Sequence, residues 1–124
     1  MSAAQVLVVE DNAKNMKLFR DVLAATGFRT LGATTGAEAV ALAGAHLPDL
    51  VLMDVQLPDF DGVEALARLR ADDRTASIPV MAVTAQAMRG DRERFLAAGF
   101  DAYVAKPVDV VELVALVQRL SAPV

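Results

Sequence analysis

The chain has 124 residues, 55% of them hydrophobic, which is enough for one hydrophobic core and one domain. With 12 basic and 16 acidic residues its net charge is −4, so it lacks the basic character typical of direct nucleic-acid binding. The absence of cysteine excludes disulfides, thiolate metal sites and cysteine nucleophiles. Because the sequence has neither a membrane-spanning apolar run nor a signal-like N-terminus, we expect a cytoplasmic protein that does not contact membranes.

Five short apolar runs alternate with stretches of helical periodicity, a pattern typical of a parallel α/β fold. The predicted strands are Val6 to Val9, Phe28 to Ala33, Leu50 to Met53, Pro79 to Val83 and Ala102 to Ala105. The first, third and fourth runs are almost continuously apolar, which is typical of strands covered by helices on both faces. These three strands are therefore predicted to lie in the middle of the sheet.

Each predicted strand is followed by a predicted helix whose apolar residues recur at spacings of three and four. The helices are expected before Gly27, from Gly36 to about His46, around Val63 to Leu69, within 86–99, and after an N-cap at Asp109. The fourth has the weakest pattern, because Gly90 lies near its start and it has few large apolar residues. The sequence thus predicts a doubly wound, flavodoxin-like (βα)5 fold with three layers and a five-stranded parallel sheet of order 2-1-3-4-5.

Polar side chains follow four of the predicted strands. Glu10 and Asp11 follow the first strand, Asp54 the third, Thr84 the fourth and Lys106 the fifth. The carboxyl ends of parallel strands meet at one edge of the sheet, where ligands of such folds bind. In the order 2-1-3-4-5, Asp54 is central, with a neighbouring strand about 4.8 Å away on each side. Lys106 lies about 10 Å away, a gap that the lysine stem can mostly close.

Two carboxylates about 4 Å apart repel by roughly 4 kcal/mol at an effective dielectric constant near 20, and one lysine is not enough to offset three acids. The arrangement calls for a hard divalent cation, and oxygen-only ligands favour Mg²⁺, with Mn²⁺ as the alternative. A carboxylate, a cation, a lysine and a hydroxyl at one edge make a phosphoryl-transfer site. Asp54 is the predicted nucleophile, which would form an acyl phosphate, while Lys106 and Thr84 would contact the phosphoryl oxygens.

Each of these residues also has an ordinary structural interpretation. Asp11 or Asn12 could cap the first helix, and Asp54 could belong to a turn. Thr84 could make a local hydrogen bond at a strand end, and Lys106 could be a solvated charge. Their coincidence at the correct strand ends favours the site over these separate explanations.

Several charged residues outside this group are interpreted as structural. Asp59 and Asp61 are expected to be turn residues. Arg89, Arg92 and Arg94 on the fourth helix are expected to form a solvated face, with a surface for a partner protein as the alternative.

Four motifs resemble the receiver domain of bacterial two-component response regulators: VVEDN at 8–12, LMDVQLPDFDG at 52–62, VTAQAMRGD at 83–91 and AYVAKP at 102–107. The resemblance covers essentially the whole chain. It implies one receiver domain over residues 1–124, without an output domain, present as a monomer or weak dimer. The implied partners are a sensor histidine kinase or a histidine phosphotransfer protein, and a downstream protein that the sequence does not identify.

The resemblance also implies roles for individual residues. Asp54 would accept the phosphoryl group from a histidine of the partner and would contribute to the Mg²⁺ site. Asp11 would bind Mg²⁺ directly and Glu10 through a water molecule, although the family more often has an aspartate at the position of Glu10. The backbone carbonyl of Gln56 would supply a further ligand.

The remaining implied roles concern phosphoryl binding and switching. Thr84 and Lys106 would contact the phosphoryl oxygens. Tyr103 matches the aromatic residue that turns inward when Thr84 moves toward the phosphoryl group, and could otherwise be a half-buried core aromatic. The peptide bond between Lys106 and Pro107 is expected to be cis, which only a following proline makes accessible.

The leading hypothesis is a free-standing signalling protein, not an enzyme, that assists its own phosphorylation and dephosphorylation and switches partner binding through the fourth helix, fifth strand and fifth helix. One alternative is a receiver domain cut from a hybrid histidine kinase. Another is a small aspartyl-phosphate phosphatase or phosphotransferase, disfavoured because Gln56 stands where such enzymes commonly need a second acid. A flavin-binding module is disfavoured because the acids after the first strand would repel a phosphate.

Overall fold

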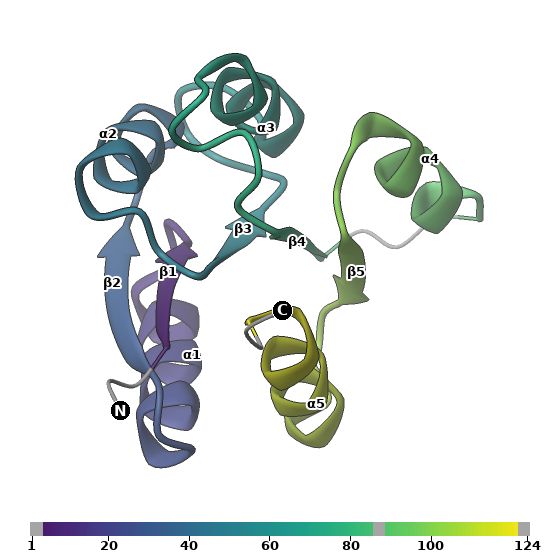
Figure 1. Ribbon diagram of the computed structural model, residues 1–124. Helices are drawn as coiled ribbons and strands as arrows, with labels where there is room; N and C mark the ends of the chain where they lie inside the picture. Colours follow the sequence, from purple (N-terminus) through teal and green to yellow (C-terminus); the bar gives the residue numbers. More distant parts are fainter. Residues whose placement is uncertain (1–3, 86–88, 122–124) are drawn as a thin grey trace.

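The structure, a computed structural model, describes residues 4–85 and 89–121. Five parallel strands form one sheet in the order β2-β1-β3-β4-β5 (Figure 1). The strands are β1 (Gln5–Val9), β2 (Arg29–Ala33), β3 (Leu50–Asp54), β4 (Val80–Thr84) and β5 (Ala102–Ala105). The helices are α1 (Ala13–Ala25), α2 (Gly36–His46), α3 (Gly62–Ala71), α4 (Asp91–Ala98) and α5 (Val110–Ser121). The predicted fold class and strand order are therefore confirmed.

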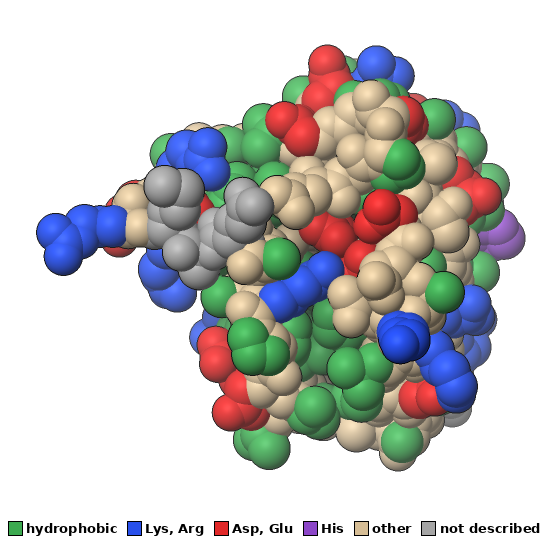
Figure 2. Space-filling model, turned by 180° about the vertical axis from the view of Figure 1, so that it is seen from behind, with side chains coloured by type: hydrophobic (Ala, Val, Ile, Leu, Met, Phe, Trp, Pro, Cys, Tyr) green, Lys and Arg blue, Asp and Glu red, His purple; other side chains and the backbone are tan. Residues whose placement is uncertain are grey.

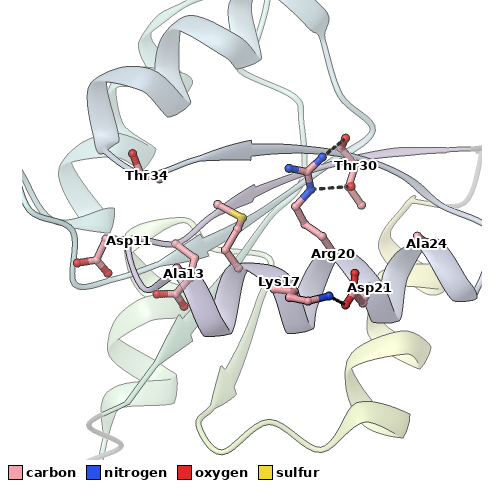
Figure 3. A pocket seen from close by; sticks show the side chains of 10 residues that line it. Asp11, Ala13, Lys17, Arg20, Asp21, Ala24, Thr30 and Thr34 are labelled. Atoms are coloured by element: carbon pink, nitrogen blue, oxygen red, sulfur yellow. Dashed lines mark hydrogen bonds and ion pairs between the residues drawn. The ribbon is translucent and has the colours of Figure 1, made fainter.

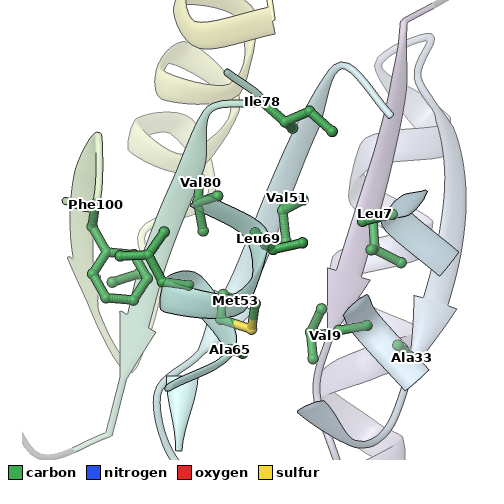
Figure 4. Packing of buried hydrophobic residues seen from close by; sticks show 14 of the residues in the cluster. Leu7, Val9, Ala33, Val51, Met53, Ala65, Leu69, Ile78, Val80 and Phe100 are labelled. Atoms are coloured by element: carbon green, nitrogen blue, oxygen red, sulfur yellow. The ribbon is translucent and has the colours of Figure 1, made fainter. Parts of the chain in front are cut away.

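Helices cover both faces of the sheet, which gives the predicted three layers. Helices α1 and α5 lie on one face, and α2, α3 and α4 lie on the other (Figure 1). Alternate residues of the central strands enter separate cores, because successive side chains of a strand point to opposite faces. Figure 4 shows the core under α2 and α3, where Val51 and Met53 of β3 pack near Leu7 and Val9 of β1.

Polar residues define where most helices begin. The side chain of Asn12 accepts a hydrogen bond from the Asn15 N–H at the start of α1, and Thr35 does the same for Glu38 in α2. Asp109 accepts from the Glu112 N–H at the start of α5, as its predicted N-cap role requires. Local side-chain chemistry thus fixes these three helix starts.

The predicted element boundaries differ from the structure at several ends. Strand β1 begins one residue earlier than predicted, at Gln5, and β2 and β4 begin one residue later, at Arg29 and Val80. Strands β3 and β4 each extend one residue beyond the apolar run, to Asp54 and Thr84, because the backbone hydrogen bond from Val55 N to Val83 O continues the pairing past the last apolar residue. Helix α4 begins at Asp91, after Gly90 in the left-handed conformation with φ of 87°. Residues 86–88, in the stretch where the fourth helix was expected, lie outside the described residues.

Among residues 4–85 and 89–121, no helix has both the length and the apolar composition that crossing a lipid bilayer requires.

The first residue of α3, Gly62, lies against the backbone of the loop that follows β3. A Cβ atom there would lie 2.8 Å from the Asp54 carbonyl oxygen and 2.9 Å from the Val55 Cα. We expect Gly62→Ala to destabilise the protein by about 1–3 kcal/mol in urea unfolding, because backbone atoms cannot move aside cheaply.

Gly44 provides the matched control within α2. A Cβ atom at Gly44 would meet only the end of the flexible Arg74 side chain, at 3.1 Å. Because alanine is favoured over glycine inside a helix, Gly44→Ala should leave the unfolding midpoint unchanged or raise it. Equal midpoints for the two variants would show that the backbone contact at Gly62 does not limit stability.

Candidate functional site

The structure brings the predicted site residues together at the carboxyl edge of the sheet. Asp54 and Thr84 are the last residues of β3 and β4, which lie side by side. Glu10 and Asp11 follow β1, the other neighbour of β3, and Lys106 follows β5. Figure 2 shows a group of acidic side chains with a basic one beside it near the middle of one face. The strand order thus brings the ends of four strands into one site.

The Lys106 side chain bridges two of the acids. Its Nζ lies 2.7 Å from Glu10 Oε1 and 3.1 Å from Asp54 Oδ2, so the lysine stem closes the expected gap. The lysine side chain is only 16% exposed. Burial alone would lower the pKa of Lys106, but its hydrogen bonds to Glu10 and Asp54 outweigh burial and raise it. The ammonium group therefore stays charged between the carboxylates.

Glu10 is the most deeply buried acid of the site, with 1% of its surface exposed. Its Oε1 accepts from Lys106, and its Oε2 accepts from the Asn12 N–H at 3.2 Å. Burial raises the pKa of Glu10 and the nearby Asp54 adds to the rise, while Lys106 and the Asn12 N–H oppose it. Both carboxylate oxygens of Glu10 thus already have donors within the protein.

Asp54 is held by a hydrogen bond on each oxygen. Its Oδ1 accepts from the Gln56 N–H at 2.9 Å, and its Oδ2 accepts from Lys106. The residue is 5% exposed, so it lies at the floor of the site. These two donors fix the orientation of the carboxylate, as a positioned nucleophile requires.

The three acids meet the geometric requirement of a metal site. One oxygen from each of Glu10, Asp11 and Asp54 lies within 4.8 Å of the other two. Opposite ligands of an octahedral Mg²⁺ are separated by about 4.2 Å, so a small inward movement or an intervening water suffices. Asn12 makes the N-cap of α1, which settles the choice between Asp11 and Asn12 as the cap. The exposed Asp11 therefore does not have the capping role that was its structural alternative.

Thr84 and Tyr103 lie on the same face of the sheet. Tyr103 of β5 pairs with Ala82 of β4, and Thr84 is two residues beyond Ala82 on that strand. Thr84 is buried, whereas Tyr103 is half-buried and stacks on Phe95 of α4 with ring centroids 5.7 Å apart. Burial, with a further contribution from Asp91, raises the pKa of Tyr103, so its hydroxyl stays protonated. The tyrosine thus links β5 to α4.

A groove of about 210 Å³ lies beside Tyr103, where α4, β5 and α5 meet. Arg92 and Leu96 of α4 line it, together with Leu116 and Arg119 of α5. Arg94 pairs with Asp91 at 3.0 Å and lies over the Phe95 ring. Arg89, Arg92 and Arg94 are exposed, as a solvated face requires, and Arg92 also borders the groove. Arg89 precedes α4 and does not lie on the helix as expected.

Asp59 lies in a bend of the loop between β3 and α3, as expected of a turn residue, and its side chain also reaches α2. Its Oδ1 accepts from the Gly36 N–H at 2.8 Å and its Oδ2 accepts from the Ala37 N–H at 2.9 Å. Asp61 was also assigned to a turn and is instead the N-cap of α3, bonded to the Glu64 N–H. The sequence signals the cap at Asp61 through the glutamate three residues later, whereas no local pattern signals a contact with a helix 22 residues upstream.

A larger groove of about 590 Å³ starts at Glu10 and Asp11 and runs between α1 and β2 (Figure 3). Arg20 of α1 crosses it: its Nε donates to Thr30 Oγ1 at 3.0 Å, and its Nη2 donates to the Thr30 carbonyl at 3.3 Å. Lys17 pairs with Asp21 along the same helix. Glu10 and Asp11 line both this groove and the site, whereas Asp54, Thr84 and Lys106 do not line the groove.

The Lys106–Pro107 peptide bond is cis, as expected from the resemblance. The response regulator receiver domain family matches residues 6–118, so the chain belongs to this family. The stretches VEDNAKNMKLF and LPDFDG resemble the single-domain regulator DivK. The comparison confirms this likeness: the chain is 51% identical to the polar-differentiation response regulator DivK of Brucella anthropi over 105 residues, which is 85% of each chain.

Solved receiver structures have the same fold. The receiver domain of a sensor histidine kinase from Pseudomonas aeruginosa, with a magnesium ion coordinated in its active-site cleft, is 37% identical and superposes with a TM-score of 0.89 over 97% of this chain and 98% of that one. A CheY-like response regulator receiver domain protein from Methanospirillum hungatei is 28% identical, with a TM-score of 0.85 over 97% and 94% of the two chains.

Removing the lysine from the site tests how strongly it offsets the acids. We expect Lys106→Met to lower the free energy of unfolding by about 3 kcal/mol in metal-free buffer, because Glu10 and Asp54 would face each other without a cation. Lys17→Met is the control, since the Lys17–Asp21 pair has side chains 77% and 63% exposed. That variant should change stability by no more than about 0.5 kcal/mol in the same urea titration. Similar losses of unfolding free energy in both variants would show that Lys106 does not offset the charges of Glu10 and Asp54.

Proposed function

We propose that the protein is a phosphorylation-switched response regulator in which Asp54 accepts a phosphoryl group from a histidine of a sensor kinase or phosphotransfer protein. The observation that carries the proposal is the position of Asp54, with Lys106 at 3.1 Å and the oxygens of Glu10 and Asp11 within 4.8 Å. Membership of the receiver family supports this assignment. The protein acts as a signalling module whose product is its own phosphorylated state.

The transfer forms one bond and breaks one. An Asp54 carboxylate oxygen attacks the phosphorus, the phosphorus–nitrogen bond breaks, and the electron pair remains on the donor's imidazole nitrogen. The Gln56 N–H holds the carboxylate in place during this step. Lys106 and the Thr84 hydroxyl would then contact oxygens of the transferred group and offset its negative charge.

We assign the acids to a magnesium site, in which Mg²⁺ would offset the carboxylate charges and polarise the phosphoryl group. Asp11 and Asp54 would bind the ion directly, with the Gln56 carbonyl as a further ligand. Glu10 would act through a water molecule, which agrees with the donors that already occupy both of its oxygens. The magnesium in the cleft of the Pseudomonas receiver domain supports the choice of ion.

The switch would run from Thr84 to Tyr103. Movement of the Thr84 hydroxyl toward a phosphoryl group opens space on the face that it shares with Tyr103, and Tyr103 would leave its stacking on Phe95 to fill it. This change would reshape the groove among α4, β5 and α5, which is the proposed surface for the downstream protein. The phosphoryl group thereby shifts the population between two arrangements of one surface.

The alternatives have less support. Gln56 occupies the position where an aspartyl-phosphate phosphatase or phosphotransferase needs a second acid. DivK, a relative with 85% of its length matched, favours a free-standing regulator over a domain cut from a hybrid kinase. A single receiver domain over residues 1–124, acting in the cytoplasm as a monomer or weak dimer, completes the proposal.

Phosphorylation by a small-molecule donor tests the acceptor. Acetyl phosphate with Mg²⁺ should give one acid-stable, base-labile phosphoryl group, which chelation of the metal should abolish. Asp54→Asn should reduce labelling by at least about 100-fold, because an amide is a poor nucleophile. Asp72→Asn is the control, since Asp72 pairs with Arg74 at the end of α3, and it should label like wild type. Equal labelling of the Asp54 variant would refute the assignment.

The switch can be tested without a partner. Beryllofluoride with Mg²⁺ mimics the phosphorylated carboxylate and should shift the backbone amide resonances around Thr84 and Tyr103 in NMR spectra. Asp54→Asn should abolish these shifts. If beryllofluoride bound but the resonances around Tyr103 stayed in place, the protein would be a receiver without this switch.

A further inference from the structure

We propose that Asp59 is a positioning residue for the magnesium site. It fastens the loop between β3 and α3 to the N-terminus of α2 and thereby sets the direction of the Gln56 carbonyl. The inference rests on the proposed function, because that carbonyl is a ligand only if the acids hold a metal ion. It adds Asp59, through its contact with α2, a helix that contributes no ligand, to the determinants of metal affinity.

The contact between Asp59 and α2 uses both carboxylate oxygens. The N–H groups of Gly36 and Ala37, which lack partners within the helix at its first turn, each donate to one of them, at 2.8 and 2.9 Å. Burial opposes the charge of Asp59, but these N–H donors outweigh it and lower the pKa of the carboxyl group. The carboxylate therefore holds two adjacent backbone groups with charge-assisted hydrogen bonds.

Helix α2 has a cap of its own, so the Asp59 contact does more than begin the helix. The Thr35 hydroxyl accepts from the Glu38 N–H at 3.0 Å, and Glu38 Oε1 accepts from the Thr34 N–H at 2.8 Å. These two bonds form a local capping arrangement from residues 34–38 alone. Asp59 binds the two N–H groups that this arrangement leaves, and so joins the helix to the loop.

The neighbouring Phe60 reinforces the attachment. A Cβ atom on Gly36 would overlap with Phe60 Cε2, so the ring packs directly against the glycine backbone. The Arg68 guanidinium of α3 lies over the same ring, 4.1 Å from its centroid. A Cβ atom at position 36 would displace the Phe60 ring from this position, so the glycine lets the loop approach α2 as it does here.

The other end of the loop is tied to the site. The Gln56 N–H donates to Asp54 Oδ1 at 2.9 Å, and the Gly62 N–H closes the loop on the Val55 carbonyl at 2.7 Å. Between these ties, Gln56 is exposed, while its neighbours Val55 and Leu57 pack against the core under α2 and α3. Asp59 and Phe60 supply the outer attachment, so releasing Asp59 leaves Leu57 and Phe60 as the contacts that hold the loop and loosens the peptide unit after Gln56.

The test compares two acids of the same loop. Asp59→Ala removes both bonds to α2, and we expect the dissociation constant for Mg²⁺, measured by calorimetric titration, to rise about 10-fold. Asp61→Asn removes the same charge while asparagine keeps the cap of α3, so its affinity should stay within about 2-fold of wild type. Asp59→Asn, which retains one acceptor oxygen, should fall between the two and replaces the alanine variant if that variant does not fold.

A second readout uses the reciprocity of coupled sites. If Asp59 couples α2 to the metal, saturating Mg²⁺ must slow hydrogen exchange of the Gly36 and Ala37 amides in wild type and not in Asp59→Ala. Unchanged Mg²⁺ affinity in the Asp59 variants, equal weakening in Asp61→Asn, or exchange rates indifferent to Mg²⁺ would each overturn the inference. Failure of the wild-type protein to bind Mg²⁺ would instead overturn the proposed function.

Discussion

Repulsion among three carboxylates at one edge of the sheet is the constraint around which the site is built. Glu10, Asp11 and Asp54 come from adjacent strands, so the parallel pairing that buries the core also forces their charges together. Lys106 offsets part of this repulsion from two strands away, through Glu10 and Asp54. In the proposed function, the remaining negative charge would attract a divalent cation to this edge and, through it, a phosphoryl group.

The two sides of the site are held differently. Hydrogen bonds hold the loop after β3 next to α2, whereas ring stacking connects β5 to α4. On the α2 side, the loop after β3 is tied by backbone bonds to itself and by Asp59 to α2. On the other, β5 is connected to α4 through the stacked rings of Tyr103 and Phe95, which have no directional bond between them. A change at Thr84 would therefore be transmitted toward β5 and α4 more readily than toward α2.

The fold and the central site residues could be predicted because their signals are local. Apolar runs marked the strands, and the polar residue after each run marked the site once the strand order was assumed. The contact of Asp59 with Gly36 could not be predicted from the sequence, because it depends on how a loop packs against a helix far away in the sequence. The hydrogen bonds that Lys106 makes with both Glu10 and Asp54 depend on side-chain rotamers, which residue patterns do not encode.

The hydrogen bonds of Arg20 bear on how the protein behaves at high concentration. Strand β2 is at the edge of the sheet, and the outward-facing carbonyl of Thr30 is a group that a strand from another molecule would need for pairing. Arg20 occupies that carbonyl and places a charged side chain across the strand. The helix that borders the site thus also protects the edge of the sheet against pairing with a strand of another molecule.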